Sequence, residues 1–329
     1  ERQETVQSSS RFSTEGQCRP AQPFGRTAVT YSFSYGPGER LGDELRVLGC
    51  VSAGPFTELY RVWSDGRMAP LVCKLLRTGI PDEEKHRRAL ELEGRVLGRI
   101  AHPNVVRTYP PPADAPTTMV LTEHVAGASL LDLLAQSPRR RLKPPIAVRI
   151  AVGIGSALAA VHAAGYLYRD LKPANVLLRD GEPVLIDFGT VYRWREGRRP
   201  RERVGTDPYM APEQCVERPL SPATDVFGLG AVTYEMLTGE WPFEDQLMNV
   251  FDRKKLRNRF PQIVHTAGPV RRRAPTVAPE VDAVVSRCLA HDPADRFASM
   301  EEAVVAFNRA LDREDRVFPD GTGDTVRAA

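Results

Sequence analysis

Cysteine is scarce in this 329-residue sequence, and its five residues stand far apart. No C-x-x-C pair occurs among them, which excludes the common structural zinc sites and a redox dithiol. An odd number of scattered cysteines does not indicate a disulfide framework either. The sequence therefore predicts a protein of a reducing compartment, and we expect it to be cytoplasmic.

Long apolar runs, internal repeats and an excess of charge of one sign are also absent. The longest apolar stretch, Ile146–Tyr168, contains Arg149 and His162, so it predicts a buried helix rather than a membrane span. The lack of a repeat excludes solenoids and propellers. The 45 basic and 42 acidic side chains nearly balance, which argues against a protein that binds nucleic acid.

The remaining composition and patterning indicate a globular protein with two parts. Apolar residues make up 42% and charged residues 26% of the chain, and its length predicts two lobes at ~150 residues each. Residues 45–122 read as strands around a helical stretch at 82–100, which begins with Asp82 and two glutamates. From Leu130 onward, helical periodicity dominates.

Both ends of the chain differ from this globular part. Residues 1–40 are rich in Ser, Gln, Gly and Pro, apart from an alternating run at 29–35 that predicts either one strand or an ordered tail. Beyond Leu311 the composition becomes polar, and Glu1 is not an initiator methionine. We therefore expect a processed product or a piece of a longer protein with further domains.

Three runs in the second half of the chain carry chemistry. They are YRDLKPAN at 168–175, IDFG at 186–189 and GTDPYMAPE at 205–213. Together they resemble the catalytic loop, the metal-binding loop and the substrate-positioning segment of eukaryotic-type (Hanks-type) protein kinases. The resemblance covers residues 44–310, and the frequent Ala and Arg are similar to the bacterial branch of that family.

This resemblance implies an α+β, two-lobed protein kinase fold, with a small antiparallel-sheet N-lobe that has one main helix and a larger helical C-lobe. It implies a Ser/Thr kinase that uses ATP and Mg²⁺ and has protein substrates with Ser or Thr acceptors. The implied parts are an N-terminal extension of unknown role (1–43), the N-lobe (44–122), a hinge (123–129), the C-lobe (130–310) and a polar tail (311–329).

The same resemblance implies roles for single residues of the C-lobe. Asp170 matches the base that accepts the proton of the attacking hydroxyl group. Lys172 matches the lysine that Ser/Thr kinases place near the transferred phosphoryl group. Asn175 and Asp187 match the two metal ligands, and hard oxygen ligands suit magnesium.

In the N-lobe, the run at 71–74 resembles the strand whose lysine holds the α- and β-phosphates. Lys74 is that lysine, and Val72 is expected to line the adenine site. Glu93 fits the carboxylate partner of Lys74, because it lies nineteen residues after Lys74 and nine before the run HPN at 102–104.

The phosphate-covering loop departs from the family pattern, and two registers compete for it. One register keeps Gly49 and Gly54 as outer glycines, but it leaves twenty-five residues between Gly49 and Lys74, more than the family usually has. The preferred register places Leu59 fifteen residues before Lys74, the usual distance. It replaces both outer glycines by Ser or Thr and adds a proline, which we expect to weaken the phosphate clamp. The nucleotide contacts it assigns to this part of the chain are Val51, Ser52, Gly54, Phe56 and Leu59.

The connection between the lobes supplies the other implied nucleotide contacts. Thr122 corresponds to the gatekeeper residue, and the backbone groups of Glu123 and Val125 are expected to hydrogen-bond adenine. Leu177 and Val51 are expected to enclose the ring from opposite lobes.

Further residues are expected to support the site. The resemblance implies an ion pair between Glu213 and Arg296, and a role for Asp225 in holding the catalytic loop. His162 and Trp241 are interpreted as core residues.

Arg169 precedes the base, and in many relatives it binds an activating phosphate. The segment 192–204 contains no Ser or Thr, but it has two glutamates and six arginines. We therefore expect activity without a phosphothreonine in the middle of this segment, with Glu196 or Glu202 in its place.

Two other functions stay open. A small-molecule phosphotransferase would share the lysine, the base and the metal aspartate, but it is not expected to carry the GT and APE runs. A nucleotide-binding, pseudokinase-like scaffold with weak catalysis is the stronger alternative, because the glycine-rich loop is degenerate.

Overall fold

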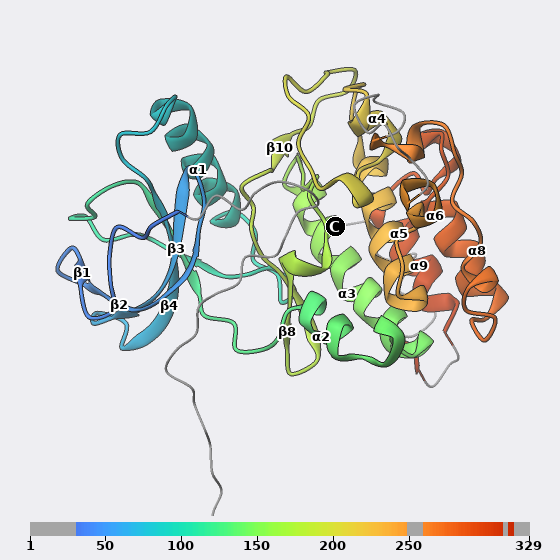
Figure 1. The fold of residues 1–329 in the computed structure, drawn as a ribbon, viewed down its shortest axis with the longest axis horizontal. Coiled ribbons are helices and arrows are strands. Elements are labelled where there is room, and N and C mark those ends of the chain that lie inside the picture. The colour runs from blue at the N-terminus through green and yellow to red at the C-terminus, as the bar shows by residue number, and fades with distance from the viewer. Residues whose placement is uncertain (1–30, 249–258, 312–314, 319–329) are drawn as a thin grey trace, which may run out of the picture.

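The computed structural model describes residues 31–248, 259–311 and 315–318, which fold into two lobes (Figure 1). An antiparallel sheet and the helix α1 (Glu83–Leu97) form the N-lobe, and a mostly helical C-lobe follows. The predicted two-lobed α+β architecture is thereby confirmed. The first part of the N-terminal extension, with Cys18, and the end of the polar tail lie outside the described residues.

Six strands form the N-lobe sheet: β1 (Arg40–Leu41), β2 (Leu45–Ala53), β3 (Thr57–Ser64), β4 (Ala69–Leu76), β5 (Thr108–Tyr109) and β6 (Met119–Glu123). Their order is β1-β2-β3-β4-β6-β5. Two bulges interrupt the pairing of β2 with β3, so β2 uses more residues than its partner over the same length. The Pro-rich stretch at 110–116 is the loop between β5 and β6.

The alternation of side chains along β3 and β4 gives the sheet two different faces. Tyr60, Val62 and Cys73 are fully buried in an apolar cluster on the outer face. Leu59 and Lys74 lie at the alternate positions, are half-buried, and occupy the inner face. The inner face is directed toward α1 and the C-lobe, because Lys74 contacts both.

Residues 31–36 run along the outer face of the sheet without forming a strand. The ring centroids of Phe33 and Tyr35 lie 5.5 Å and 6.2 Å from that of Tyr60. Over its described part, the alternating run near the N-terminus is therefore an ordered segment that covers the sheet.

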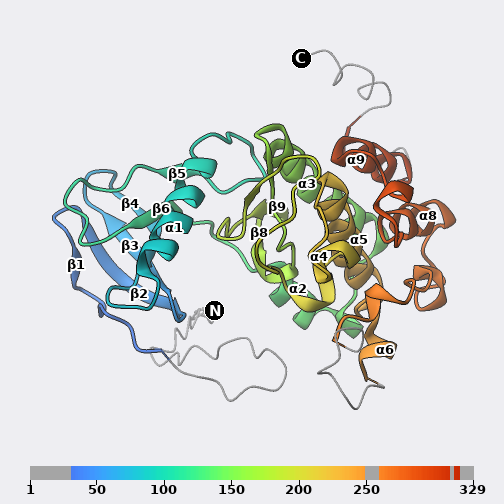
Figure 2. The ribbon, with the colours of Figure 1, turned by 90° about the horizontal axis from the view of Figure 1, so that it is seen from above.

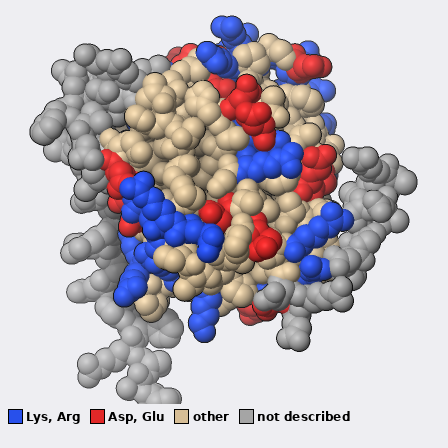
Figure 3. Space-filling view, turned by 90° about the vertical axis from the view of Figure 1, so that its right-hand side faces the viewer, with Lys and Arg blue, Asp and Glu red and all other residues tan. Residues whose placement is uncertain are grey.

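The C-lobe elements are α2 (Leu130–Gln136), α3 (Pro144–Ala163), β7 (Tyr166–Leu167), β8 (Val176–Arg179), β9 (Glu182–Leu185), β10 (Tyr192–Arg193), α4 (Pro212–Cys215), α5 (Pro222–Thr238), α6 (Glu244–Met248), α8 (Pro279–Cys288) and α9 (Met300–Arg309). Seen from above, the helices of this lobe gather on one side and the N-lobe sheet on the other (Figure 2). On the far face of the C-lobe, basic and acidic side chains are interspersed (Figure 3).

The core of the C-lobe is built around α5, in which every residue from Ala223 to Thr238 is buried. Helix α3 packs between α5 and α9. By length and composition α3 is apolar enough to cross a membrane, yet 61% of its most apolar window is buried inside the lobe. That burial is typical of the core helix of a folded domain, as predicted for this stretch.

Two close backbone arrangements position the site. In the β8–β9 hairpin, Val176 pairs with Leu185, and the N–H of Ile186 donates to the carbonyl of Asn175 (2.9 Å). This pairing places the two predicted metal ligands at the same end of the hairpin. In the hinge, Gly127 has φ 155°, and a Cβ on it would lie 2.0 Å from a carbonyl oxygen of β8, so only glycine fits there.

Candidate active site

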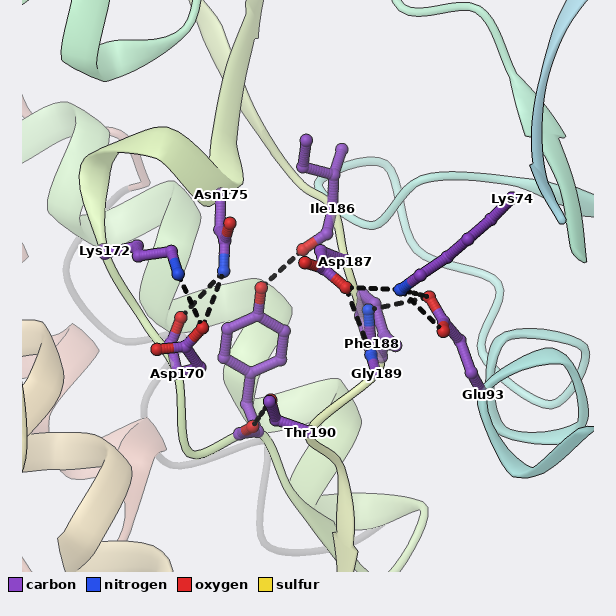
Figure 4. A network of polar contacts seen from close by, with 11 residues as sticks. Lys74, Glu93, Asp170, Lys172, Asn175, Ile186, Asp187, Phe188, Gly189 and Thr190 are labelled. Carbon is purple, nitrogen blue, oxygen red and sulfur yellow. Dashed lines mark hydrogen bonds and ion pairs between the residues drawn. The ribbon is translucent and has the colours of Figure 1, made fainter. Parts of the chain in front are cut away.

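Lys74 of β4 lies between the lobes and contacts two carboxylates (Figure 4). Its Nζ is 2.9 Å from Oε2 of Glu93 in α1, and 2.7 Å from Oδ1 of Asp187, which follows β9 in the C-lobe. Only 3% of Glu93 is exposed. The structure therefore brings together the predicted lysine, its predicted partner and one predicted metal ligand.

The charges of these three groups stabilise one another. Burial lowers the pKa of Lys74, but the negative charges of Glu93 and Asp187 outweigh it and raise that pKa above its ordinary value. Desolvation by the surrounding protein raises the pKa of Asp187 although its side chain is partly exposed, yet the ammonium beside it holds the pKa below its usual range. For Glu93, burial dominates and raises the pKa, while Lys74 opposes the shift. Lys74 therefore favours the ionised form of Asp187, and the two carboxylates favour the charged form of Lys74.

The IDFG run connects this trio to the body of the C-lobe. Asp187 has φ 59°, a conformation that residues other than glycine rarely adopt. Its side chain is 47% exposed. The next residue, Phe188, is fully buried, and its N–H donates to Oε1 of Glu93 (3.2 Å). The unusual backbone therefore directs the carboxylate outward and the phenyl ring inward.

Asp170 lies in a small polar cluster and is 8% exposed. Thr206 donates its hydroxyl to Oδ1 (2.7 Å), and Nζ of Lys172 is 2.8 Å from Oδ2 and 3.1 Å from the Thr206 hydroxyl. The amide nitrogen of Asn175 donates to the backbone carbonyl of Asp170 (2.9 Å). A hydroxyl group therefore fits between the predicted base and the predicted lysine.

Helix α5 supports this catalytic loop through Asp225, which is 2% exposed. Asp225 accepts the backbone N–H groups of Tyr168 and Arg169, each at 2.8 Å, and contacts Nε2 of His162 at 2.8 Å. The expected support by Asp225 is present, and His162 is a nearly buried partner of it rather than a residue of the reacting cluster.

The second expected support is the buried ion pair of Glu213 with Arg296, whose two N–H···O distances are 2.8 Å and 2.9 Å. Trp241 is half-buried against the core, and its indole N–H donates to the hydroxyl of Tyr209 (3.1 Å).

The residues predicted to contact adenine lie on both lobes. On the inner face of the sheet, Leu59 pairs with Lys74, and Val72 pairs with Thr122 on the next strand, so these four side chains form one group. From the C-lobe, Leu177 bridges to Ser129 at the start of α2.

Glu123 ends β6 and Val125 follows it in the hinge, while Val51 lies in β2. The carboxylate of Glu123 accepts the backbone N–H of Arg107 (2.9 Å) and contacts the guanidinium of Arg179 (2.7 Å), while Val125 is buried. Val51 lies at the second bulge of β2 and is 40% exposed.

The turn between β2 and β3 falls at residues 54–56, which is the place that the preferred register predicts. Ser52 pairs with Leu59 just before the turn, and Phe56 lies at its tip, 42% exposed. Gly49 lies inside β2 at the first bulge, and it does not take a positive φ. The second bulge, at Val51, adds one residue to the distance from Gly49 to Lys74.

Several residues that hold the site together were not predicted. Tyr168 stands where the family signature has histidine, and its hydroxyl donates to the backbone carbonyl of Ile186. On α1, the ring of His86 stacks on that of Phe56, with centroids 3.7 Å apart. The tyrosine was visible in the YRD run, whereas nothing local in the sequence indicates the contact of His86.

Known proteins resemble this chain in sequence and in fold. The family model for the protein kinase domain matches residues 45–306. The serine/threonine-protein kinase PknE of Mycobacterium tuberculosis is 30% identical, over 82% of this chain and 47% of its own length. The serine/threonine-protein kinase pkn3 of Myxococcus xanthus is 30% identical, over 85% of this chain and 52% of its own length.

Among solved structures, the PknI kinase domain of Mycobacterium tuberculosis has the same fold, with a TM-score of 0.64 at 23% identity. The match covers 84% of this chain and 100% of that one. The chain spans about half the length of the curated relatives it matches. Because the family model covers most of the chain, this protein belongs to the protein kinase family, within its bacterial serine/threonine branch.

Proposed function

We propose that the chain is a Ser/Thr protein kinase that transfers the γ-phosphoryl group of ATP to hydroxyl groups of proteins. The observation that carries this proposal is the contact of Lys74 with both Glu93 and Asp187, which joins the predicted phosphate-holding lysine to the predicted metal-binding aspartate. Phosphoryl transfer depends mainly on positioning and charge neutralisation, and this arrangement serves both.

In the proposed reaction, Asp170 orients the substrate hydroxyl and accepts its proton as the oxygen attacks the γ-phosphorus. The hydroxyl of Thr206 on Oδ1 supports this role, because a substrate hydroxyl needs the same kind of position. Lys172 contacts the same carboxylate at 2.8 Å and offers positive charge to the transferred group. Asp170 is therefore the proposed base, and Lys172 the proposed stabiliser of developing charge.

The family implies Mg²⁺, and the donor set fits that ion. Among the described residues, no three His, Cys, Asp or Glu side chains gather into a metal site of their own. Magnesium is usually held by one or two carboxylates together with phosphate oxygens and water. The exposed carboxylate of Asp187 and the amide oxygen of Asn175 are the proposed ligands, and bound Mg²⁺ neutralises charge on the β- and γ-phosphates.

Activity without phosphorylation of the segment 192–204 is part of the proposal. Glu202 contacts Lys85 of α1 at 2.6 Å, so a fixed carboxylate already joins this segment to the helix that carries Glu93. Arg169, the usual phosphate ligand, donates to the carbonyl of Thr190 (2.7 Å) and lies over the ring of Tyr192, 5.0 Å from its centroid. If phosphorylation of Thr190 proves essential for activity, this part of the proposal is wrong.

A nucleotide-binding scaffold with weak catalysis is the second candidate. The observation in its favour is the phosphate-covering loop, in which Ser52 and Thr57 replace the outer glycines and Pro55 offers no N–H. ATP binding without measurable turnover would support this candidate. We propose a cytoplasmic location in either case, because both candidates need ATP and the scattered cysteines are typical of a reducing compartment.

The experiment that tests the proposed function measures transfer of labelled phosphate from ATP and Mg²⁺ to a generic protein substrate. Asp187→Asn is expected to abolish transfer, because it removes the charge of the proposed metal ligand. Asp180→Asn is the matched control, since Asp180 lies at the other end of the same hairpin, is exposed and also has a positive φ (52°). Transfer that survives Asp187→Asn at the level of the control would reject the kinase mechanism.

A further inference from the structure

The segment Tyr31–Gly36, called the N-terminal strap below, makes polar contacts with a buried carboxylate of the N-lobe. The N–H of Ser34 donates to Oε2 of Glu58 (2.9 Å), and its hydroxyl donates to Oε1 (2.7 Å). Glu58 lies in β3 at a core-facing position and is 1% exposed. The strap therefore supplies two of the hydrogen bonds that a buried carboxylate requires.

Arg77, just after β4, supplies the positive charge of this network. Its Nη1 lies 3.0 Å from Oε1 of Glu58. Its Nη2 donates to the carbonyl of Ser32 in the strap, and the guanidinium lies over the ring of Tyr31, 5.7 Å from the centroid. Only 16% of the Arg77 side chain is exposed. Glu58 and the strap thus fix the guanidinium from two sides.

The remaining donors of Arg77 reach the phosphate-covering loop. Nε donates to the carbonyl of Gly54 (2.8 Å), and the backbone N–H donates to the carbonyl of Phe56 (2.9 Å). The aromatic tip of that loop stacks on His86 of α1. The loop is therefore held from one side by α1 and from the other by an arginine that the strap keeps in place.

We propose that Arg77 is a positioning residue for the phosphate-covering loop and that the N-terminal strap is what orients it. Because the loop lacks both outer glycines, contacts from outside the loop also determine its shape. The carbonyls that Arg77 holds keep the loop over the nucleotide phosphates. This inference rests on the proposed function, because it assumes that the loop covers ATP. It assigns a role to the described end of the N-terminal extension.

The first test compares Arg77→Gln with Arg67→Gln in the full chain. Arg67 is a matched control, because its guanidinium also binds a carboxylate (Glu44), a carbonyl (Pro110) and a tyrosine ring, 5.7 Å from its centroid, at a site away from the loop. Arg77→Gln is expected to raise KM for ATP about tenfold, the loss of one charge-assisted hydrogen bond, with kcat within about twofold. An equal KM in the two variants would overturn the proposal.

The second test uses an added negative charge to detach the strap from the sheet. It measures the detachment by a method that does not depend on kinase activity. Ser34→Asp places a carboxylate beside Glu58 and is expected to expel the strap, whereas Ser32→Asp adds the same charge beside Arg77 and is expected to retain it. Cys50 reports the outcome, because its thiol donates to the carbonyl of Tyr35 (3.5 Å) under the strap. Its alkylation, followed by peptide mass spectrometry, is expected to accelerate at least about fivefold in Ser34→Asp only.

The two tests separate the possible failures. Accelerated Cys50 labelling together with a raised KM for ATP in Ser34→Asp supports the proposal. Accelerated labelling with an unchanged KM shows that the strap does not act on the loop, and unchanged labelling shows that Ser34 does not hold the strap; both overturn it. A parent chain without phosphate transfer refutes the proposed function instead, and the effect of the strap is then read from the affinity for ATP.

Discussion

Replacing Arg296 by methionine removes the most buried charge of the C-lobe, and the structure gives the size of the effect. The Arg296 side chain has 0% exposure. Its five hydrogen bonds reach Glu213 twice and the carbonyls of Ala290, Ala223 and His291, at 2.8–3.1 Å. The variant leaves the carboxylate of Glu213, 5% exposed, without its counter-charge. Breaking a buried pair in this way costs about 3–5 kcal/mol.

The expected loss corresponds to a fall in Tm of roughly 10 °C, at about 2–4 °C per kcal/mol for a domain of this size. Urea unfolding followed by tryptophan fluorescence measures the free energy directly. The double variant Arg296→Met/Glu213→Leu is expected to be more stable than Arg296→Met alone, because it removes the orphaned charge as well. Arg88→Met is the control, since its ion pair with Glu84 is exposed to solvent and is expected to contribute little to stability.

If Arg296→Met costs no more free energy of unfolding than Arg88→Met, the buried pair does not make the expected contribution. The same conclusion follows if the double variant is less stable than the single one by the full cost of Glu213→Leu, because the two groups would then contribute independently.

Three further predictions concern stability and reactivity. Gly127→Ala is expected to cost well over the ~1–2 kcal/mol of a positive φ in urea unfolding, because the added Cβ overlaps a backbone carbonyl. Gly181→Ala, also at positive φ but with open space around it, is expected to cost only that amount. Burial raises the pKa of Cys73 and of Cys288 to about 12, so both thiols are expected to resist iodoacetamide at pH 8 in the folded protein and to react in urea; rapid native labelling of either would contradict this. Burial raises the pKa of Glu58, but its hydrogen bonds outweigh burial and lower the net value. Its contribution to stability is therefore complete above about pH 5 and is lost as the pH falls through the folded pKa, and Glu58→Gln is expected to flatten that acid decline in free energy of unfolding.

The predictions from sequence succeeded where function depends on contiguous residues. Asp170, Lys172 and Asn175 lie within six positions, so the local loop conformation alone brings them near one another. Lys74 and Glu93 were predicted over a longer distance from the spacing that the kinase resemblance implies, and regular strand and helix geometry brings them together. The two-lobed kinase fold was implied by the same resemblance.

The predictions stopped where contacts join distant irregular segments. Neither Ser34 nor Arg77 belongs to a motif, and their meeting at Glu58 depends on a segment that has no secondary structure. One signal was available: Glu58 shares its face of β3 with Tyr60 and Val62, and a glutamate at such a core-facing position requires a buried partner. The bulges in β2 were also not predicted, because each extra residue shifts the phase of the alternation and the two bulges lie too close together for either phase to be recognised.

The catalytic loop is attached to the core of the C-lobe through α5. Asp225 fixes the loop from the buried helix α5, whereas most of the arginine-rich residues 193–203 are exposed. Substitutions in that surface segment therefore leave the anchor of the base in place. The orientation of the catalytic loop is therefore inherited with the core of the domain and not with the sequence of its surface.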